Sequence, residues 1–190
     1  IIHKGAYVGN YAYGGGLGVS SKPQSGDVWG STYIALLGGV VKKNIYAAGS
    51  SGSVNDAFGI KNFTASANAY IEGGSVRNVF GGGWEGHVGN HTKIENNVVV
   101  PKGLNESYDD DIYGETHVVI GQIDGTSLFD GVPAIERNAY AGGEGGSIYG
   151  TANVTVNNGY IGYRYIGSDS PYYFTYTGNG TGDQPESDVR

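Results

Sequence analysis

The densest group of carboxylates in the chain is Asp109, Asp110 and Asp111, with Glu115 shortly after them. Carboxylate oxygens are ligands that Ca²⁺ prefers in proteins. Such acids, with a basic partner such as Arg137, could also perform acid–base chemistry on a polysaccharide. A run of acids in a loop is, however, commonly only solvated charge. We therefore state a Ca²⁺ site at these four acids as a hypothesis, expect no other cofactor, assign no catalytic residue and favour a protein that is not an enzyme.

Aromatic side chains are the second group with a chemical use. The chain has 16 tyrosines and 2 tryptophans among 190 residues, and exposed rings offer the π faces on which the C–H faces of sugars pack. Trp84 and Glu85 follow a glycine turn, and Tyr108 and Tyr113 flank the acidic run. These four residues are the candidate ligand-binding residues. The alternative is that most tyrosines pack between the units of a repeat.

Several other functions are disfavoured by the residues themselves. A chain without cysteine has no disulfide framework and no thiol nucleophile. His87 and His91 are four residues apart, but the intervening glycine indicates a turn and not a zinc-binding helix. The run 81–83 lacks the Gly-Lys-Ser/Thr ending of a phosphate loop. A net charge of −7 with only 11 basic residues disfavours nucleic acid, and no apolar run approaches the roughly 20 residues that span a bilayer.

A repeat organises the chain. An aromatic residue followed by three small residues occurs at Tyr13, Tyr46, Phe80 and Tyr140, at intervals of 33, 34 and 60 residues. A fifth, degenerate copy places Tyr165 at the same position. In three copies an asparagine lies two residues before the aromatic and follows a basic residue, as in Lys43-Asn44, Arg77-Asn78 and Arg137-Asn138.

The repeat predicts an all-β fold. Short runs rich in Val, Ile, Tyr and Thr fit strands, and glycine pairs separate them, so that each unit reads as strand, turn, strand, turn and short strand. Strands are expected at 33–36, 69–72 and 154–156. One unit cannot bury its apolar face alone, whereas stacked units bury a continuous core. We therefore predict a β-solenoid over residues 1–167, with a loop insertion at about 98–132 and a divergent segment at 168–190.

The orientation of the repeated aromatics has two solutions. The asparagine and the aromatic are two residues apart and share one face of a strand. If that face points inward, the rings stack in the core and the amides hydrogen-bond along the stack. If it points outward, the rings form an exposed ribbon. We expect the inward solution, because five solvent-facing rings would form a large apolar patch.

The run Asn78-Val79-Phe80-Gly81-Gly82-Gly83, followed by Gly-x-Val and then Thr-x-Ile, resembles the glycine-rich repeat of large surface or adhesin-like β-helix proteins of gut Bacteroidetes and similar bacteria. The resemblance covers about residues 5–98 and 133–167. It implies a right-handed β-helix at the cell surface. It implies no catalytic residue in this chain.

Together these observations predict an exported or cell-surface repeat scaffold with a structural or attachment role. The alternatives are a polysaccharide-binding module and a pectin-lyase-like enzyme that degrades polysaccharides. The expected partners are glycans, other surface proteins and further coils of a longer chain, with no nucleic acid and no membrane span. The chain opens Ile1-Ile2 without an initiator methionine, which we interpret as a processed product or an excerpt of a longer protein.

Overall fold

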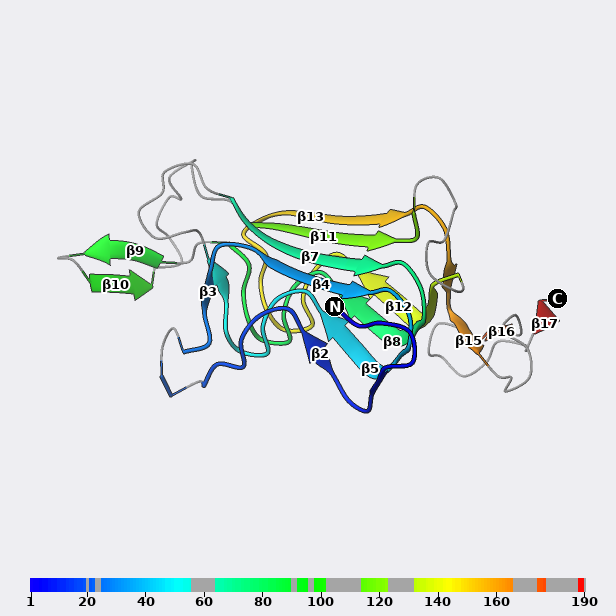
Figure 1. Ribbon diagram of the computed structural model, residues 1–190. Coiled ribbons are helices and arrows are strands. Elements are labelled where there is room, and N and C mark those ends of the chain that lie inside the picture. Colours follow the sequence, from blue (N-terminus) through cyan, green and yellow to red (C-terminus); the bar gives the residue numbers. More distant parts are fainter. Residues whose placement is uncertain are drawn as a thin grey trace.

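The computed structural model describes residues 1–19, 21–22, 25–55, 64–89, 92–95, 98–101, 114–122, 132–165, 174–176 and 188–189 (Figure 1). Within these ranges every regular element is a β-strand, and none is a helix. The predicted all-β class is therefore confirmed. No helix in the described part of the chain is long and apolar enough to cross a membrane.

Two broad parallel sheets contain most of the strands. The first sheet has the order β13 (Gly150–Val156), β11 (Gly114–Ile120), β7 (Ala65–Ile71) and β4 (Thr32–Leu36). The second sheet has the order β1 (Tyr7–Val8), β5 (Val40–Tyr46), β8 (Ser75–Phe80), β12 (Ala134–Tyr140) and β14 (Tyr160–Ile161), and β2 (Ala12–Tyr13) also pairs with β5.

A third, narrow sheet is formed by strands that lie, along the chain, between those of the second and the first sheet. It pairs β3 (Val28–Trp29) with β6 (Val54–Asn55) in parallel. Single parallel bridges continue it from Val54 to Val88 and from Val88 to Ile148. Each pass of the chain therefore meets the second, third and first sheets in that order, as in β5, β6 and β7.

The remaining strands are antiparallel and lie beside this stack in Figure 1. β9 (Thr92–Glu95) pairs with β10 (Val98–Pro101). β15 (Tyr163–Tyr165), β16 (Phe174–Tyr176) and β17 (Asp188–Val189) form a small sheet near the C-terminus.

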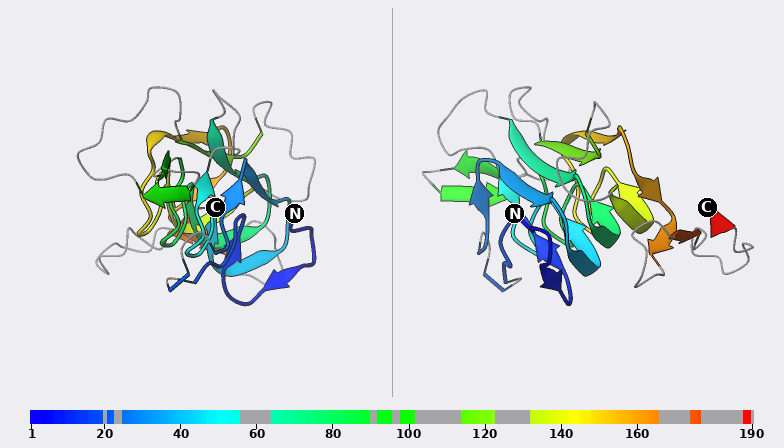
Figure 2. Two further views of the ribbon diagram at one scale, coloured as in Figure 1. Left: turned by 90° about the vertical axis from the view of Figure 1, so that its left-hand side faces the viewer. Right: turned by 45° about the vertical axis from the view of Figure 1, so that its right-hand side comes forward.

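The order of the parallel strands follows the order of the chain. Figure 2 shows the colours running from blue through cyan and green to yellow across the broad sheets, so each pass lies beside the one before it. The pairs β4–β7, β7–β11 and β11–β13 are in unbroken register. This arrangement is consistent with a β-solenoid, although the sheets remain separate and do not close on one another.

Alternating side chains build the core. In β7 every second side chain is fully buried, namely those of Ala65, Ala67, Ala69 and Ile71. The second sheet adds Val41, Ile45, Val76 and Val79 to the same apolar cluster. Full burial of one valine or isoleucine side chain contributes roughly 1.5–3 kcal/mol. The apolar cluster shared by the two sheets therefore stabilises their packing on one another.

The glycine pairs turn the chain from the first sheet into the second, as predicted. Gly39 lies between β4 and β5 with φ of 77°, and Gly74 lies between β7 and β8 with φ of 74°. This left-handed region favours glycine. A Cβ on Gly74 would also lie 2.4 Å from the carbonyl oxygen of Gly39, so the stacked turns leave no room for a side chain.

The predicted insertion at about 98–132 is wrong for residues 114–120. These residues form β11, which is an inner strand of the first sheet and pairs with β7 and β13. Its side chains at Thr116, Val118 and Ile120 are fully buried. Residues 102–113 and 123–131 lie outside the described residues.

Candidate ligand-binding site

The four repeated aromatics form one stack of rings along the ends of β2, β5, β8 and β12. The ring centroids are 5.0 Å apart between Tyr13 and Tyr46, 4.9 Å between Tyr46 and Phe80, and 4.7 Å between Phe80 and Tyr140. The planes of neighbouring rings differ by only 10–14°. The predicted stacking of these residues is confirmed, and the side chain of Tyr165 is outside the described residues.

The stack lies on the outer face of the second sheet, so the inward orientation that we expected is wrong. Ile45 and Val79 are fully buried in the core cluster. Successive side chains of a strand point to opposite faces, which places Tyr46 and Phe80 on the outer side. Tyr46 is nevertheless only 1% exposed. The rings cover one another, and the ring of Trp84, 6.4 Å away, adds to the cover of Tyr46, so the outer face carries no large apolar patch there.

A row of asparagines runs beside the rings. Asn78 Nδ2 donates to Asn44 Oδ1 at 2.9 Å, and the backbone N–H of Asn138 donates to Asn78 Oδ1 at 3.2 Å. The predicted hydrogen bonding of amides along the stack is confirmed for Asn44 and Asn78. The register slips by one residue between Val41 and Asn44, and this slip aligns Asn44 with Asn78.

Glu144 joins the rings to the asparagines. It lies in the turn after β12, where its backbone N–H donates to the carbonyl of Gly83 at 3.0 Å. Its carboxylate accepts a hydrogen bond from the hydroxyl of Tyr46 and a longer one, of 3.5 Å, from Asn44 Nδ2. Burial, and then the bond to Glu144, raises the pKa of Tyr46 well above its ordinary value. Tyr46 therefore stays protonated and donates to the carboxylate throughout the neutral pH range.

An open cavity lies beside Tyr140, the last ring of the stack among the described side chains. Its volume is about 410 Å³, and it is lined by Asn44, Asn78, Phe80, Arg137, Asn138, Tyr140, Gly143 and Glu144. Tyr140 is 43% exposed, whereas Phe80, one pass earlier, is 7% exposed. The cavity thus combines an accessible ring with amides, one cation and one anion.

The predicted ligand-binding residues Trp84 and Glu85 lie close to this cavity but do not line it. The ring of Trp84 meets that of Tyr11 edge-on at 5.3 Å, and the side chain is 39% exposed. Glu85 accepts a hydrogen bond from Ser51 Oγ at 3.0 Å. Both belong to the stacked glycine turns, because the N–H of Trp84 donates to the carbonyl of Gly49 and the N–H of Glu85 to that of Ser50.

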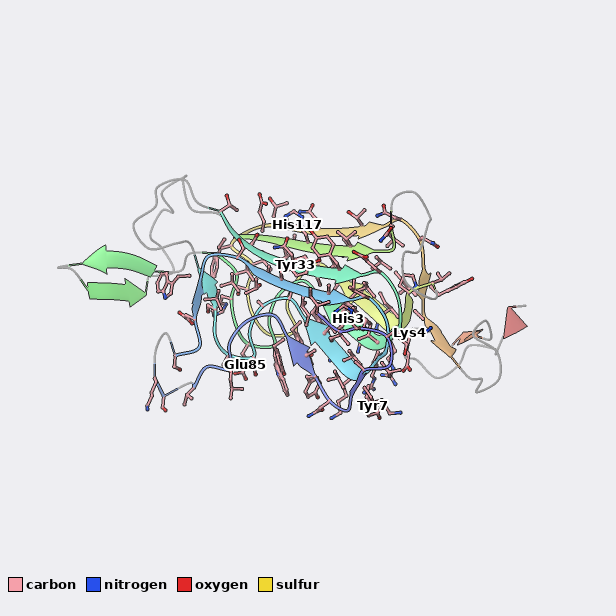
Figure 3. The ribbon with its side chains drawn as sticks, viewed as in Figure 1. His3, Lys4, Tyr7, Tyr33, Glu85 and His117 are labelled. Carbon is pink, nitrogen blue, oxygen red and sulfur yellow. The ribbon has the colours of Figure 1, made fainter. Side chains whose placement is uncertain are left out.

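Of the four acids of the Ca²⁺ hypothesis, Glu115 is the one that lies within the described residues. Glu115 lies on β11 with a carboxylate oxygen 3.2 Å from Nε2 of His117. Figure 3 shows His117 on the first sheet and Glu85 on another side of the molecule. Among the described residues, no three His, Asp or Glu side chains are grouped closely enough to hold a metal ion. The remaining predicted residues, Tyr108, Asp109, Asp110, Asp111 and Tyr113, lie outside the described ranges, so the hypothesis stays a prediction.

Sequence reasoning named the ring and amide positions of the repeat, but it did not identify a site in them. The signal for Tyr140 and Asn138 was their recurrence at the repeat positions. Glu144 gave no signal, because its partner Tyr46 is 98 residues away in the chain.

No protein-family model, curated protein or solved structure shows significant similarity to the chain. The resemblance to the glycine-rich surface repeats therefore stays a prediction.

Proposed function

We propose that the chain is a right-handed β-solenoid that serves as an exported or cell-surface scaffold, with a structural or attachment role. Its coils would be the successive passes through the second, third and first sheets. Each coil packs on the next through paired strand edges and stacked side chains, so further coils can be added without a new kind of interface. Such a role needs no catalytic residue.

One comparison of exposures carries this proposal. In β11, Val118 and Ile120 are fully buried. Their register partners in β13, Val154 and Val156, are 38% and 51% exposed. The two strands differ in that β11 has neighbours on both sides, whereas β13 is at the edge of its sheet. The end of the stack therefore offers an apolar row and a strand edge of the kind that another strand can cover.

The opposite end also carries exposed apolar side chains. Ile1, Tyr7, Leu17 and Tyr33 are each more than half exposed and all belong to the first pass of the chain. Between the first pass and the pass that contains β12 and β13, the described residues include one exposed large hydrophobic side chain, that of Trp84. Apolar exposure concentrated at the two ends favours assembly along the stack, head to tail.

Sedimentation velocity over a wide range of concentrations tests the structural role. The chain is expected to associate as its concentration rises. Val156→Lys, which places a charge in the inner row at the open end, is expected to abolish association. Thr155→Lys is the matched control, because Thr155 is exposed on the other face of β13 and should leave association unchanged. A monomer at all concentrations would refute the structural role.

Retention under flow tests the attachment role. Microspheres coated with the chain are expected to remain on surfaces that carry glycans or glycoproteins at shear rates that remove uncoated spheres. Loss of both self-association and retention would contradict the proposed function. Release of products from a polysaccharide would instead establish an enzyme.

A further inference from the structure

The cavity beside Tyr140 contains polar groups beyond those that are hydrogen-bonded between the stacked coils. Asn78 and Asn44 are bonded to each other, and Tyr46 is bonded to Glu144. Arg137 and the ring of Tyr140, by contrast, are exposed. Both line the cavity with Asn138 and Glu144. The ring of Tyr140 is therefore accessible and surrounded by hydrogen-bonding groups.

We propose that this cavity binds a neutral saccharide, one unit of a glycan chain. The inference supplies a partner for the attachment role proposed above and rests on that role for its biological meaning. The binding itself is measured independently of attachment.

The lining matches the chemistry of a sugar. A pyranose presents a C–H face, which packs on an aromatic ring such as that of Tyr140. Its hydroxyl groups both donate and accept hydrogen bonds. The guanidinium of Arg137 only donates, the carboxylate of Glu144 only accepts, and the amide of Asn138 can do either. A ring with all three kinds of partner fits a polyol better than a purely apolar or purely ionic ligand.

The charges favour a neutral sugar over an acidic one. One cation and one anion line the cavity, so its formal charge is zero. The whole chain has a net charge of −7, which repels anionic polysaccharides at long range. A uronic acid would also bring its carboxylate close to that of Glu144, whose position is fixed by Tyr46 and Asn44.

Part of the site is held in place before a ligand arrives. The hydrogen bonds of Asn78 fix the amide row, and stacking at 4.7 Å on Phe80 fixes the ring of Tyr140. The cavity is open, so a single sugar unit is expected to bind with a dissociation constant on the order of 1 mM. Several copies of the site along an assembly would raise the apparent affinity by multivalency.

The test uses the full chain with neutral oligosaccharides of glucose, mannose, galactose, xylose and N-acetylglucosamine, and with an oligogalacturonate as the acidic comparison. Saturation-transfer NMR and titration of intrinsic fluorescence report binding. At least one neutral oligosaccharide is expected to bind, and more tightly than the oligogalacturonate. Failure of every neutral oligosaccharide, or preference for the acidic one, would overturn the proposal.

Two variants test whether the saccharide binds in the cavity. Tyr140→Ala is expected to weaken binding at least 10-fold. Tyr33→Ala is the matched control, because Tyr33 is an exposed tyrosine stacked on Tyr70 at 5.0 Å on the first sheet. It is expected to bind like the unaltered chain, and an equal loss in both variants would overturn the proposal. If Tyr140→Ala does not fold, Arg137→Gln, at an exposed position, is expected to weaken binding at least 3-fold, and unchanged binding would have the same consequence.

The two proposals fail in different ways. Oligosaccharide binding that is lost in Tyr140→Ala, without retention of coated microspheres under flow, would refute the attachment role and support the site. Retention under flow that is unchanged in Tyr140→Ala would support the attachment role and refute this site as its glycan receptor.

Discussion

Replacement of Gly82 by alanine is expected to destabilise the protein, because the next pass of the chain occupies the space that a Cβ would need. That Cβ would lie 2.7 Å from the backbone nitrogen of Gly143 and 2.8 Å from its Cα. It would also lie 2.8 Å from Cδ1 of Ile148. Two of these three atoms belong to the backbone and cannot rotate away. Overpacking of this kind costs about 1–3 kcal/mol.

Gly142 is the matched control. It follows Tyr140 by two residues, as Gly82 follows Phe80, and the N–H of Gly82 donates to the carbonyl of Gly142 at 3.1 Å. A Cβ on Gly142 would meet no heavy atom within 4 Å. Because alanine restricts the unfolded chain, Gly142→Ala is expected to be neutral or to stabilise by about 0.4–1 kcal/mol.

The two variants should therefore differ by about 1–4 kcal/mol in the free energy of unfolding. For a chain of this length the difference corresponds to about 2–16 °C in melting temperature. Urea unfolding followed by circular dichroism and fluorescence gives both the midpoint and the slope. Equal stabilities of the two variants, or a Gly82→Ala variant as stable as the unaltered chain, would refute the stacking of the two turns.

Two further predictions concern hydrogen bonds of the stack. Thr116 is fully buried, and its hydroxyl donates to the carbonyl of Ala141 at 2.6 Å. Thr116→Val is therefore expected to lower the free energy of unfolding in urea by about 1–3 kcal/mol, and Thr116→Ser to lower it less. Equal losses in the two variants would contradict a role for the hydroxyl. Tyr46 has a raised pKa in the folded state, so below pH of about 10 it is protonated in both states, and above that pH only the unfolded chain releases its proton. Stability is therefore expected to fall as pH rises above about 10, and to fall less steeply in Tyr46→Phe; identical pH profiles would contradict this assignment.

The sequence predicted the strands and the stacked rings because a repeat places equivalent residues at equivalent positions. The spacing of Tyr46 and Phe80 alone was enough to predict their stacking. The inward or outward orientation of the rings was not predictable in the same way. Ile45 lies beside Tyr46 and Val79 beside Phe80, so both faces of each strand are apolar. The two faces of the strand are distinguished only in the three-dimensional structure, where the rings cover one another on the outer face.

The strand β11 and the cavity were not predicted for the same physical reason. β11 was missed because Gly121-Gln122 follows it, whereas a glycine pair follows β7. The cavity was missed because it combines distant passes of the chain, such as Asn78 with Asn138 and Asn44 with Glu144. Contacts between successive passes of the chain depend on how the passes are aligned with one another, and a short sequence pattern does not specify that alignment.

An engineered disulfide tests the register of the stacked strands most directly, since the chain has no cysteine of its own. Asn68 of β7 lies directly opposite His117 of β11. Opposite residues of paired strands are about 5 Å apart, within the Cα separation that a disulfide spans. The pair Ser66→Cys and His117→Cys moves one thiol two residues along β7, to about 8 Å, which is too far.

Under the same mild oxidant, we expect Asn68→Cys with His117→Cys to form an intramolecular disulfide, and Ser66→Cys with His117→Cys to keep both thiols free for alkylation. Mass spectrometry after alkylation distinguishes the two states. A disulfide in the second variant, or in neither, would contradict the in-register stacking of β7 on β11 and with it the proposed solenoid.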